Sequence, residues 1–193
     1  RHTRLQGDWS SDVCSSDLAY QNAMLFNCPS TIIKNAPGKL FFKKKNARLV
    51  KKKIRLLSAG WSPNALKGFR HLVWLDDNLD FDVYDFTYIG RCSYKFKHIT
   101  IKPPISPELL PYEIRKHDIF IFPSELEACS NILTEALHCG LPSIAYNGSS
   151  NPEILQDAGF LFQDASEIPG RLEEIVRKYD SFQQKLPSFT ISK

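Results

Sequence analysis

The sequence contains no long apolar segment and no paired cysteines. A membrane-spanning helix needs about 18 consecutive apolar residues, and no stretch reaches that length. The N-terminus lacks the charged-then-apolar order of a signal peptide. The five cysteines stand singly, without a Cys-x-x-Cys pair or a histidine at zinc-site spacing. These absences predict a soluble cytoplasmic protein without a structural metal.

The excess of basic over acidic residues comes from one short segment. The formal net charge of +4 comes largely from Lys43–Lys53, which reads KKKNARLVKKK. Blocks of like charge are commonly solvated linkers, and a nucleic-acid-binding protein would spread its basic residues over one face. We therefore expect no nucleic-acid partner. The 193 residues fit one globular domain of ordinary size.

Residues 1–18 have no hydrophobic period and a Ser/Asp-rich centre. The part that reads DWSSDVCSSDL resembles the translation of a sequencing adapter. Two interpretations are open: a non-native leader that arose during sequence assembly, and a disordered Ser/Asp-rich tail. Both exclude the segment from fold prediction.

Apolar strands alternate with amphipathic helices along most of the chain. Ile54–Ala59 is a continuous apolar run that ends at Gly60, which is typical of a strand buried on both faces of a parallel sheet. Repeated alternation predicts an α/β fold, a doubly wound parallel sheet of the Rossmann-like type. Further strands are expected at residues 30–35, 84–90, 98–101, 118–124, 141–147 and 160–162, and helices at residues 67–79, 106–117, 130–139, 151–159 and 171–179.

The expected helix at residues 106–117 has a typical N-terminal sequence. Ser106 suits the N-cap, Pro107 the first helical position and Glu108 the first turn. Pro111 should shorten or bend this helix, because proline has no backbone N–H to donate.

Two loops follow expected strands at one edge of the sheet, Gly60–Lys67 and Ser124–Asn131. Ligands of doubly wound sheets bind at the carboxyl edge, where loops lead into helix N-termini. Lys67 offers a point charge for a pyrophosphate, and Gly68 permits close approach of the backbone. A Lys-Gly pair is equally compatible with a plain surface turn.

The second loop leads into a helix whose N-terminus can hold an anion. Ser130 or Asn131 is expected to cap it, so that backbone N–H groups face the ligand. Glu135, one turn inside the helix, can accept two hydrogen bonds from a vicinal diol such as a ribose. Glu127 in the loop can contact another part of the same ligand. Their spacing alone is also compatible with two solvated side chains.

Three segments carry a family likeness when they are taken together. They read SAGWSPNALKGF, DIFIFPSELEACSNILTEALHCGLPSIAYNGSSNPEI and AGFLF, within residues 54–179. The most specific part is the pair of glutamates with seven residues between them, followed by EALHCGLP. This order of motifs resembles the C-terminal, donor-binding domain of retaining GT-B glycosyltransferases (glycosyltransferase family 4-like, group 1), which include sucrose and glycogen synthases. The resemblance implies one half of a GT-B architecture.

The resemblance also implies roles for individual residues. Glu135 matches the glutamate that holds the ribose hydroxyls, and Glu127 the one that contacts the transferred sugar. Lys67 matches the lysine that neutralises the diphosphate leaving group, so that Lys67 and Glu127 are the catalytic candidates. The remaining substrate-binding candidates are Arg91 and the loop residues Cys129, Ser130, Asn131 and Ile132. The donor would be a nucleotide-sugar such as a UDP- or GDP-sugar, and the reaction would need no metal or other cofactor.

One position departs from the family pattern. Trp61 stands where an arginine commonly follows the strand-end glycine, and losing one pre-organised charge contact typically costs about 3 kcal/mol of transition-state stabilisation. Arg70 or Arg91 could supply that charge, although both also suit an ordinary surface position. Trp61 favours an alternative, a non-catalytic module that binds a nucleotide or a partner. A dehydrogenase is a weaker alternative, because no G-x-G-x-x-G follows an expected strand.

The likeness divides the chain into four parts. Residues 1–18 are the leader, 19–53 a remnant of the acceptor domain with the basic linker, 54–180 the nucleotide-sugar-binding domain, and 181–193 a truncated tail. We expect a chain truncated at both ends that transfers no sugar by itself. The acceptor, a glycan or a lipid-linked molecule of polysaccharide biosynthesis, would bind through the missing N-terminal domain. Peripheral contact with the inner face of the membrane is left open.

Overall fold

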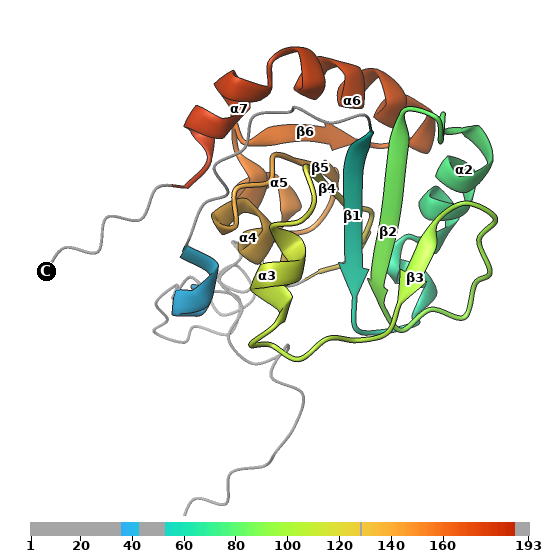
Figure 1. Ribbon diagram of the computed structural model, residues 1–193, viewed down its shortest axis with the longest axis horizontal. Helices are drawn as coiled ribbons and strands as arrows, with labels where there is room; N and C mark the ends of the chain where they lie inside the picture. Colours follow the sequence, from blue (N-terminus) through green and yellow to red (C-terminus); the bar gives the residue numbers. More distant parts are fainter. Residues whose placement is uncertain (1–35, 43–52, 128, 188–193) are drawn as a thin grey trace, which may run out of the picture.

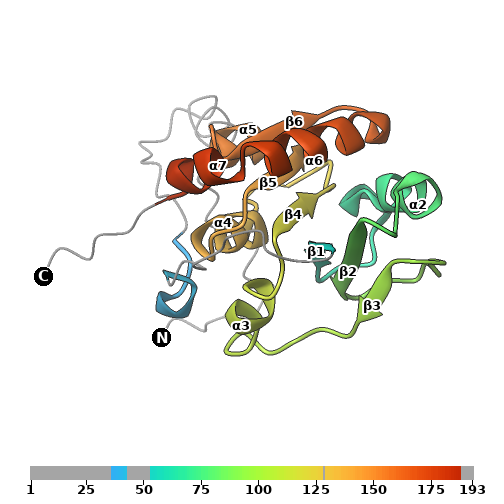
Figure 2. The ribbon, with the colours of Figure 1, turned by 45° about the horizontal axis from the view of Figure 1, so that its top comes forward.

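The computed structural model describes residues 36–42, 53–127 and 129–187, which form one sheet between two layers of helices (Figures 1 and 2). The expected strand at residues 30–35 and the basic segment at residues 43–52 lie outside the described residues. In the described part of the chain, no helix combines the length and the apolar character needed to cross a membrane.

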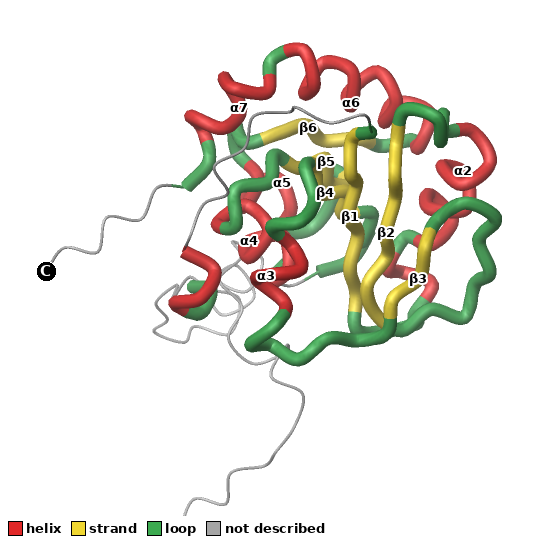
Figure 3. The backbone as a smooth tube through the Cα atoms, viewed as in Figure 1, coloured by secondary structure: helices red, strands yellow, loops and turns green. Residues whose placement is uncertain are grey.

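The sheet has six strands in the order β3-β2-β1-β4-β5-β6, and every neighbouring pair is parallel (Figure 3). This arrangement confirms the predicted Rossmann-like sheet, and the strand expected at residues 160–162 is its edge strand β6. The strands are β1 Ile54–Gly60, β2 Tyr84–Gly90, β3 Thr100–Lys102, β4 Ile119–Phe122, β5 Ser143–Tyr146 and β6 Gly159–Phe162.

Alternate residues of the central strands point to opposite faces, and helices cover both faces. Leu56 of β1 packs with α2, α6 and α7, whereas Leu57 packs on the other side with α3, α4 and α5. Burial on both faces explains the continuous apolar runs of β1 and β4. The helices and 3-10 turns (η) are η1 Lys39–Phe42, η2 Ala65–Lys67, α2 Phe69–Asn78, α3 Leu110–Ile114, α4 Asn131–His138, α5 Asn151–Leu155, η3 Ala165–Glu167, α6 Ile168–Arg177 and α7 Tyr179–Lys185.

The helix expected at residues 106–117 is shorter than predicted. Leu109 and Leu110 both donate backbone hydrogen bonds to Ser106 O, which closes a turn, and α3 begins only at Leu110. Ser106 is therefore not the N-cap. Pro111 lies in the first turn of α3 rather than in its interior, and there its missing N–H leaves no helical carbonyl without a partner.

Helix structure continues through position 180. The helix expected at residues 171–179 is two helices, and α7 places Phe182 in the core beside Phe160. The Tyr179 hydroxyl donates to Asp118 O at 2.8 Å, which connects α7 to the start of β4. The packed domain thus extends to Leu186, which is also buried.

The strand order places one switch point at β1 and β4. The chain leaves β1 towards β2 and β3 on one side, then crosses back to β4 on the other side. The loops after β1 and β4 consequently lie next to each other at the carboxyl edge. This is the position at which doubly wound sheets bind ligands.

Candidate functional site

The loop after β1 presents Lys67 on a short, capped turn. The side chain of Asn64 accepts a hydrogen bond from Leu66 N–H at 3.0 Å and so caps η2. Gly68 follows in the left-handed region at φ +74°, which favours glycine. Lys67 therefore has a defined backbone position immediately before helix α2.

Gly68 allows this turn to lie directly against the end of β4. A Cβ atom at this position would come within 1.9 Å of Pro123 O. The neighbouring Leu66 O accepts a hydrogen bond from Glu125 N–H at 2.9 Å. The close approach that the structure shows at Gly68 is to the backbone of the second loop, and the predicted approach to a pyrophosphate stays a prediction.

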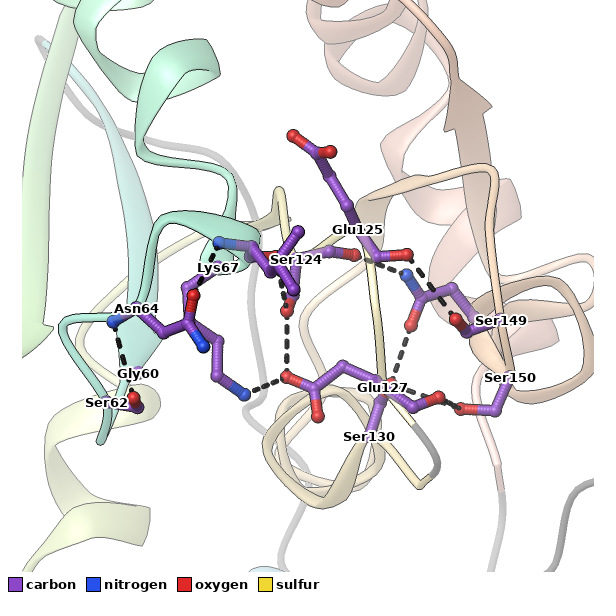
Figure 4. A network of polar contacts seen from close by, with 12 residues as sticks. Gly60, Ser62, Asn64, Lys67, Ser124, Glu125, Glu127, Ser130, Ser149 and Ser150 are labelled. Carbon is purple, nitrogen blue, oxygen red and sulfur yellow. Dashed lines mark hydrogen bonds and ion pairs between the residues drawn. The ribbon is translucent and has the colours of Figure 1, made fainter.

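Lys67 and Glu127 meet at the switch point. Lys67 Nζ donates to Glu127 Oε1, and Ser124 Oγ donates to the same carboxylate oxygen at 2.8 Å (Figure 4). The two charged side chains are largely buried, with exposed fractions of 28% and 17%. Such a pair keeps a cation and an acid at the edge of the sheet without full solvation.

The two glutamates of this loop have separate partners: in Figure 4 Glu125 extends upwards, away from Lys67, whereas Glu127 extends towards Lys67. Glu125 Oε1 pairs with Arg70 Nε at 2.7 Å, so Arg70 is engaged away from Lys67. Arg91 follows β2 with an exposed side chain, and its backbone N–H donates to Gly60 O at 3.3 Å. Neither arginine forms an ion pair with Glu127 in the part of the chain that the structure describes.

Glu135 is a half-buried carboxyl group on α4. Burial raises its pKa from the ordinary value near 4.5 to about 7. Within residues 53–127 and 129–187, no hydrogen bond or ion pair to its carboxyl group is found. A buried carboxylate without a partner has a strong tendency to accept hydrogen bonds from a ligand.

The N-terminus of α4 differs from the prediction in one respect. Ser130 occupies the N-cap position, but its hydroxyl makes no capping hydrogen bond and donates instead to Asn151 Oδ1 at 2.6 Å. Asn131 begins the helix with an exposed side chain. Ile132 is buried in the core, so only its backbone can face a ligand. Cys129 Sγ lies 3.7 Å from Asn131 Oδ1.

A protein-family model described as glycosyl transferases group 1 matches residues 28–178 of the chain. The chain belongs to this family. No curated protein matches the sequence.

Solved structures resemble the chain in fold. A lipopolysaccharide outer core galactosyltransferase, WaaB in its apo form, superposes with a TM-score of 0.68 at 14% identity, over 93% of this chain and 57% of that one. A sucrose-phosphate synthase from Thermosynechococcus elongatus superposes with a TM-score of 0.67 at 16% identity, over 90% of this chain and 53% of that one. A glycosyltransferase from Rickettsia africae ESF-5 superposes with a TM-score of 0.68 at 15% identity, over 89% of this chain and 55% of that one. These neighbours are GT-B glycosyltransferases, and this chain spans little more than half their length.

The group 1 glycosyltransferase chain shows no metal centre in its described residues. No group of three or more His, Cys, Asp or Glu side chains there could hold a metal ion. His117 is buried, its Nδ1 lies 3.0 Å from Glu113 O, and burial lowers its pKa to about 4. It therefore has a structural environment.

Two features of this candidate site were not predicted. Ser124 binds the Glu127 carboxylate, and residues 149–151 bond the loop before α4 from the side of β5. A signal for the second feature was present, because the polar run Ser-Ser-Asn follows an expected strand at the carboxyl edge. Its meaning depends on β5 lying beside β4, which the sequence alone did not show.

Proposed function

We propose that this chain is the donor-binding domain of a retaining glycosyltransferase that takes a hexose from a nucleotide-sugar such as a UDP- or GDP-sugar. The observation that carries the proposal is the contact between Lys67 and Glu127 at the switch point of the sheet. A cation and an acid from two loops are brought together where such folds bind nucleotides.

The residues divide the donor between them. Lys67 neutralises the diphosphate as it departs, and the backbone amides at the start of α4 favour negative charge at the same place. Glu127 leaves Lys67 and accepts hydrogen bonds from the sugar. Glu135 accepts hydrogen bonds from the two ribose hydroxyl groups. These hydroxyl groups supply the partners that its carboxyl group lacks among the described residues.

The proposed chemistry depends on positioning and charge stabilisation. The acceptor hydroxyl attacks the sugar on the face from which the diphosphate leaves, so that the configuration is retained. No pair of catalytic carboxylates is required for this route, and the leaving charge is met by Lys67 rather than by a metal ion. We propose that the acceptor is a glycan or a lipid-linked molecule of polysaccharide biosynthesis, and that the reaction takes place in the cytoplasm, with peripheral membrane contact of the full-length protein.

Calorimetric titration of this chain with UDP and with GDP tests the proposal. We expect one of the two to bind, and we expect Lys67→Ala to raise its Kd by about tenfold or more, because a charge-assisted contact to phosphate is lost. Lys97→Ala is the matched control, since Lys97 pairs with Asp77 at an exposed position. EDTA should leave the Kd unchanged. Failure of both nucleotides to bind would contradict the proposed function.

The exposed Trp61 supports a second candidate, a non-catalytic nucleotide- or partner-binding module. Its side chain follows β1 with an exposed fraction of 46%, where the family pattern has a cation. Glu135→Ala in the full-length protein distinguishes the two functions. An enzyme would lose turnover, whereas a module that binds a protein partner would retain that partner.

A further inference from the structure

Three consecutive polar residues between β5 and α5 bond the loop that carries Glu127. We call residues Ser149–Asn151 the polar triplet. Each of its side chains donates to one backbone carbonyl of residues 124–127: Ser149 Oγ to Glu125 O at 3.4 Å, Ser150 Oγ to Glu127 O at 3.1 Å and Asn151 Nδ2 to Ser124 O at 3.0 Å (Figure 4). Three of the four carbonyl groups in this loop segment are thereby held from the β5 side.

Asn151 is the centre of the polar triplet. Its side chain is completely buried, and Nδ2 also donates to Tyr146 O at 3.0 Å, while Oδ1 accepts from Ser130 Oγ at 2.6 Å. Both partners of the nitrogen are carbonyl groups and the partner of the oxygen is a hydroxyl group. The network therefore determines the orientation of the amide, and its three bonds connect the ends of β4 and β5 with the start of α4.

The two serine hydroxyls of this network donate to different partners, and Ser130 makes no capping hydrogen bond to α4. A serine hydroxyl has one proton, and Ser130 gives its proton to Asn151. Ser150 donates its hydroxyl proton to Glu127 O. No proton is then left for a hydrogen bond between Ser130 Oγ and Ser150 Oγ, which lie 3.4 Å apart. The start of α4 is thus fixed through Asn151 rather than by capping.

The two loops are packed closely as well as hydrogen-bonded. Ser149 has φ +51°, a left-handed conformation that non-glycine residues rarely adopt. A Cβ atom on Gly148 would lie 3.1 Å from Glu125 O. A conformation of this kind persists where surrounding contacts over-determine it, and such positions cluster at functional sites.

We infer that the polar triplet positions the donor loop: it fixes the backbone of residues 124–127 and the start of α4, so that Glu127 faces Lys67 and the donor. The identity of the ligand rests on the proposed function. None of the three side chains bonds Lys67 or the Glu127 carboxylate in the described structure. The triplet therefore acts through the backbone of this loop, and its members are positioning residues.

Binding of UDP and GDP to triplet variants tests this inference. Asn151→Ala removes the three hydrogen bonds to Ser124 O, Tyr146 O and Ser130 Oγ, and we expect the Kd to rise at least about tenfold. Ser150→Ala removes one bond and should raise it about threefold. The control is Gln183→Ala, which removes the hydrogen bond from the Gln183 side-chain amide to Gly140 O at a distant site. The control should lower the unfolding temperature and leave the Kd unchanged.

Asn151→Asp adds a readout that a loss of stability alone would not move. Its ionised carboxylate would face the carbonyl oxygens of Ser124 and Tyr146, whereas the protonated acid can donate to one of them and accept from Ser130. The ratio of the variant's Kd to that of the wild type should fall as the pH is lowered from 8 to 5. A ratio that does not change with pH, together with wild-type affinity in Asn151→Ala, would refute the inference.

Hydrogen exchange separates this inference from the proposed function. If the wild type binds neither nucleotide, the proposed function fails, but the triplet can still be tested on the amides of Glu125 and Thr134, which bond Leu66 O and Ser130 O. Followed by NMR, these amides should exchange at least about tenfold faster in Asn151→Ala than in Gln183→Ala. Equal exchange in the two variants would overturn the positioning role.

Discussion

At the scale of single residues, Glu135 has opposite effects on folding and on binding. Its pKa is near 4.5 in the unfolded chain and about 7 in the folded protein, because burial disfavours the charged form. The stability associated with its protonated form is fully present below about pH 4.5. It is lost as the pH rises to about 7, because the unfolded chain releases this proton first.

Glu135→Gln should therefore stabilise the fold at high pH while weakening the site. We expect the free energy of unfolding at pH 8 to rise by about 1–3 kcal/mol relative to the wild type, with little difference at pH 4.5. The same substitution should raise the Kd for the bound nucleotide, since one acceptor for the ribose is lost. Urea unfolding at both pH values measures the first effect, and Glu173→Gln on the exposed face of α6 is the control. A stability difference independent of pH would contradict the argument.

At the scale of elements, the junction of the β1 and β4 loops depends on one glycine. Gly68→Ala would place a Cβ atom 1.9 Å from Pro123 O, in a left-handed backbone conformation. The clash is with a backbone atom, so it cannot be relieved by rotating a side chain. We expect a loss of about 2–4 kcal/mol in the free energy of unfolding. Gly170→Ala is a matched control on α6, where nothing lies within 4 Å, and it should be neutral or slightly stabilising. Thermal unfolding of both variants measures the difference, and equal midpoints would disprove it.

The sequence predicted the elements wherever burial leaves a strong pattern. Strand β1 and strand β4 read as continuous apolar runs because helices cover both of their faces, and the site loops follow from the strand ends. The start of α3 was mispredicted, because Ser106 and Pro107 also suit the turn that the structure shows. Local sequence does not distinguish a turn that continues as a helix from one that stops.

The charged residues of the candidate site could be predicted from the sequence, but the hydrogen bonds that position them could not. Lys67 and Glu127 could be assigned to one edge, since both follow strands of a parallel sheet. The bond from Ser130 to Asn151 joins residues that are 21 positions apart, and it depends on how β5 and α5 pack against β4. Side-chain partners of this kind depend on tertiary packing, which cannot be predicted from hydrophobic periodicity or from capping preference.

At the scale of the whole molecule, the described residues form one six-stranded sheet, and the chain spans little more than half the length of its structural neighbours. On the proposed function, the described residues contact the donor from one side. Transfer requires an acceptor held in line with the sugar and a site from which water is excluded. The described residues provide charge for the diphosphate, but they neither hold an acceptor in line nor exclude water from the site.

We therefore expect these 193 residues to bind the nucleotide weakly and to transfer no sugar. Donor contacts alone should give a Kd of about 0.1–1 mM, because the ligand stays partly solvated and the ion pair between the Lys67 and Glu127 side chains must open to receive it. Calorimetry measures the affinity, and incubation with radiolabelled UDP-glucose or GDP-mannose, followed by separation of the free sugar and any glycoside, measures turnover. The Lys67→Ala chain gives the background for both assays. Turnover of the labelled donor by the wild-type chain above that background would show that the described domain is catalytically sufficient, and the expectation would be wrong.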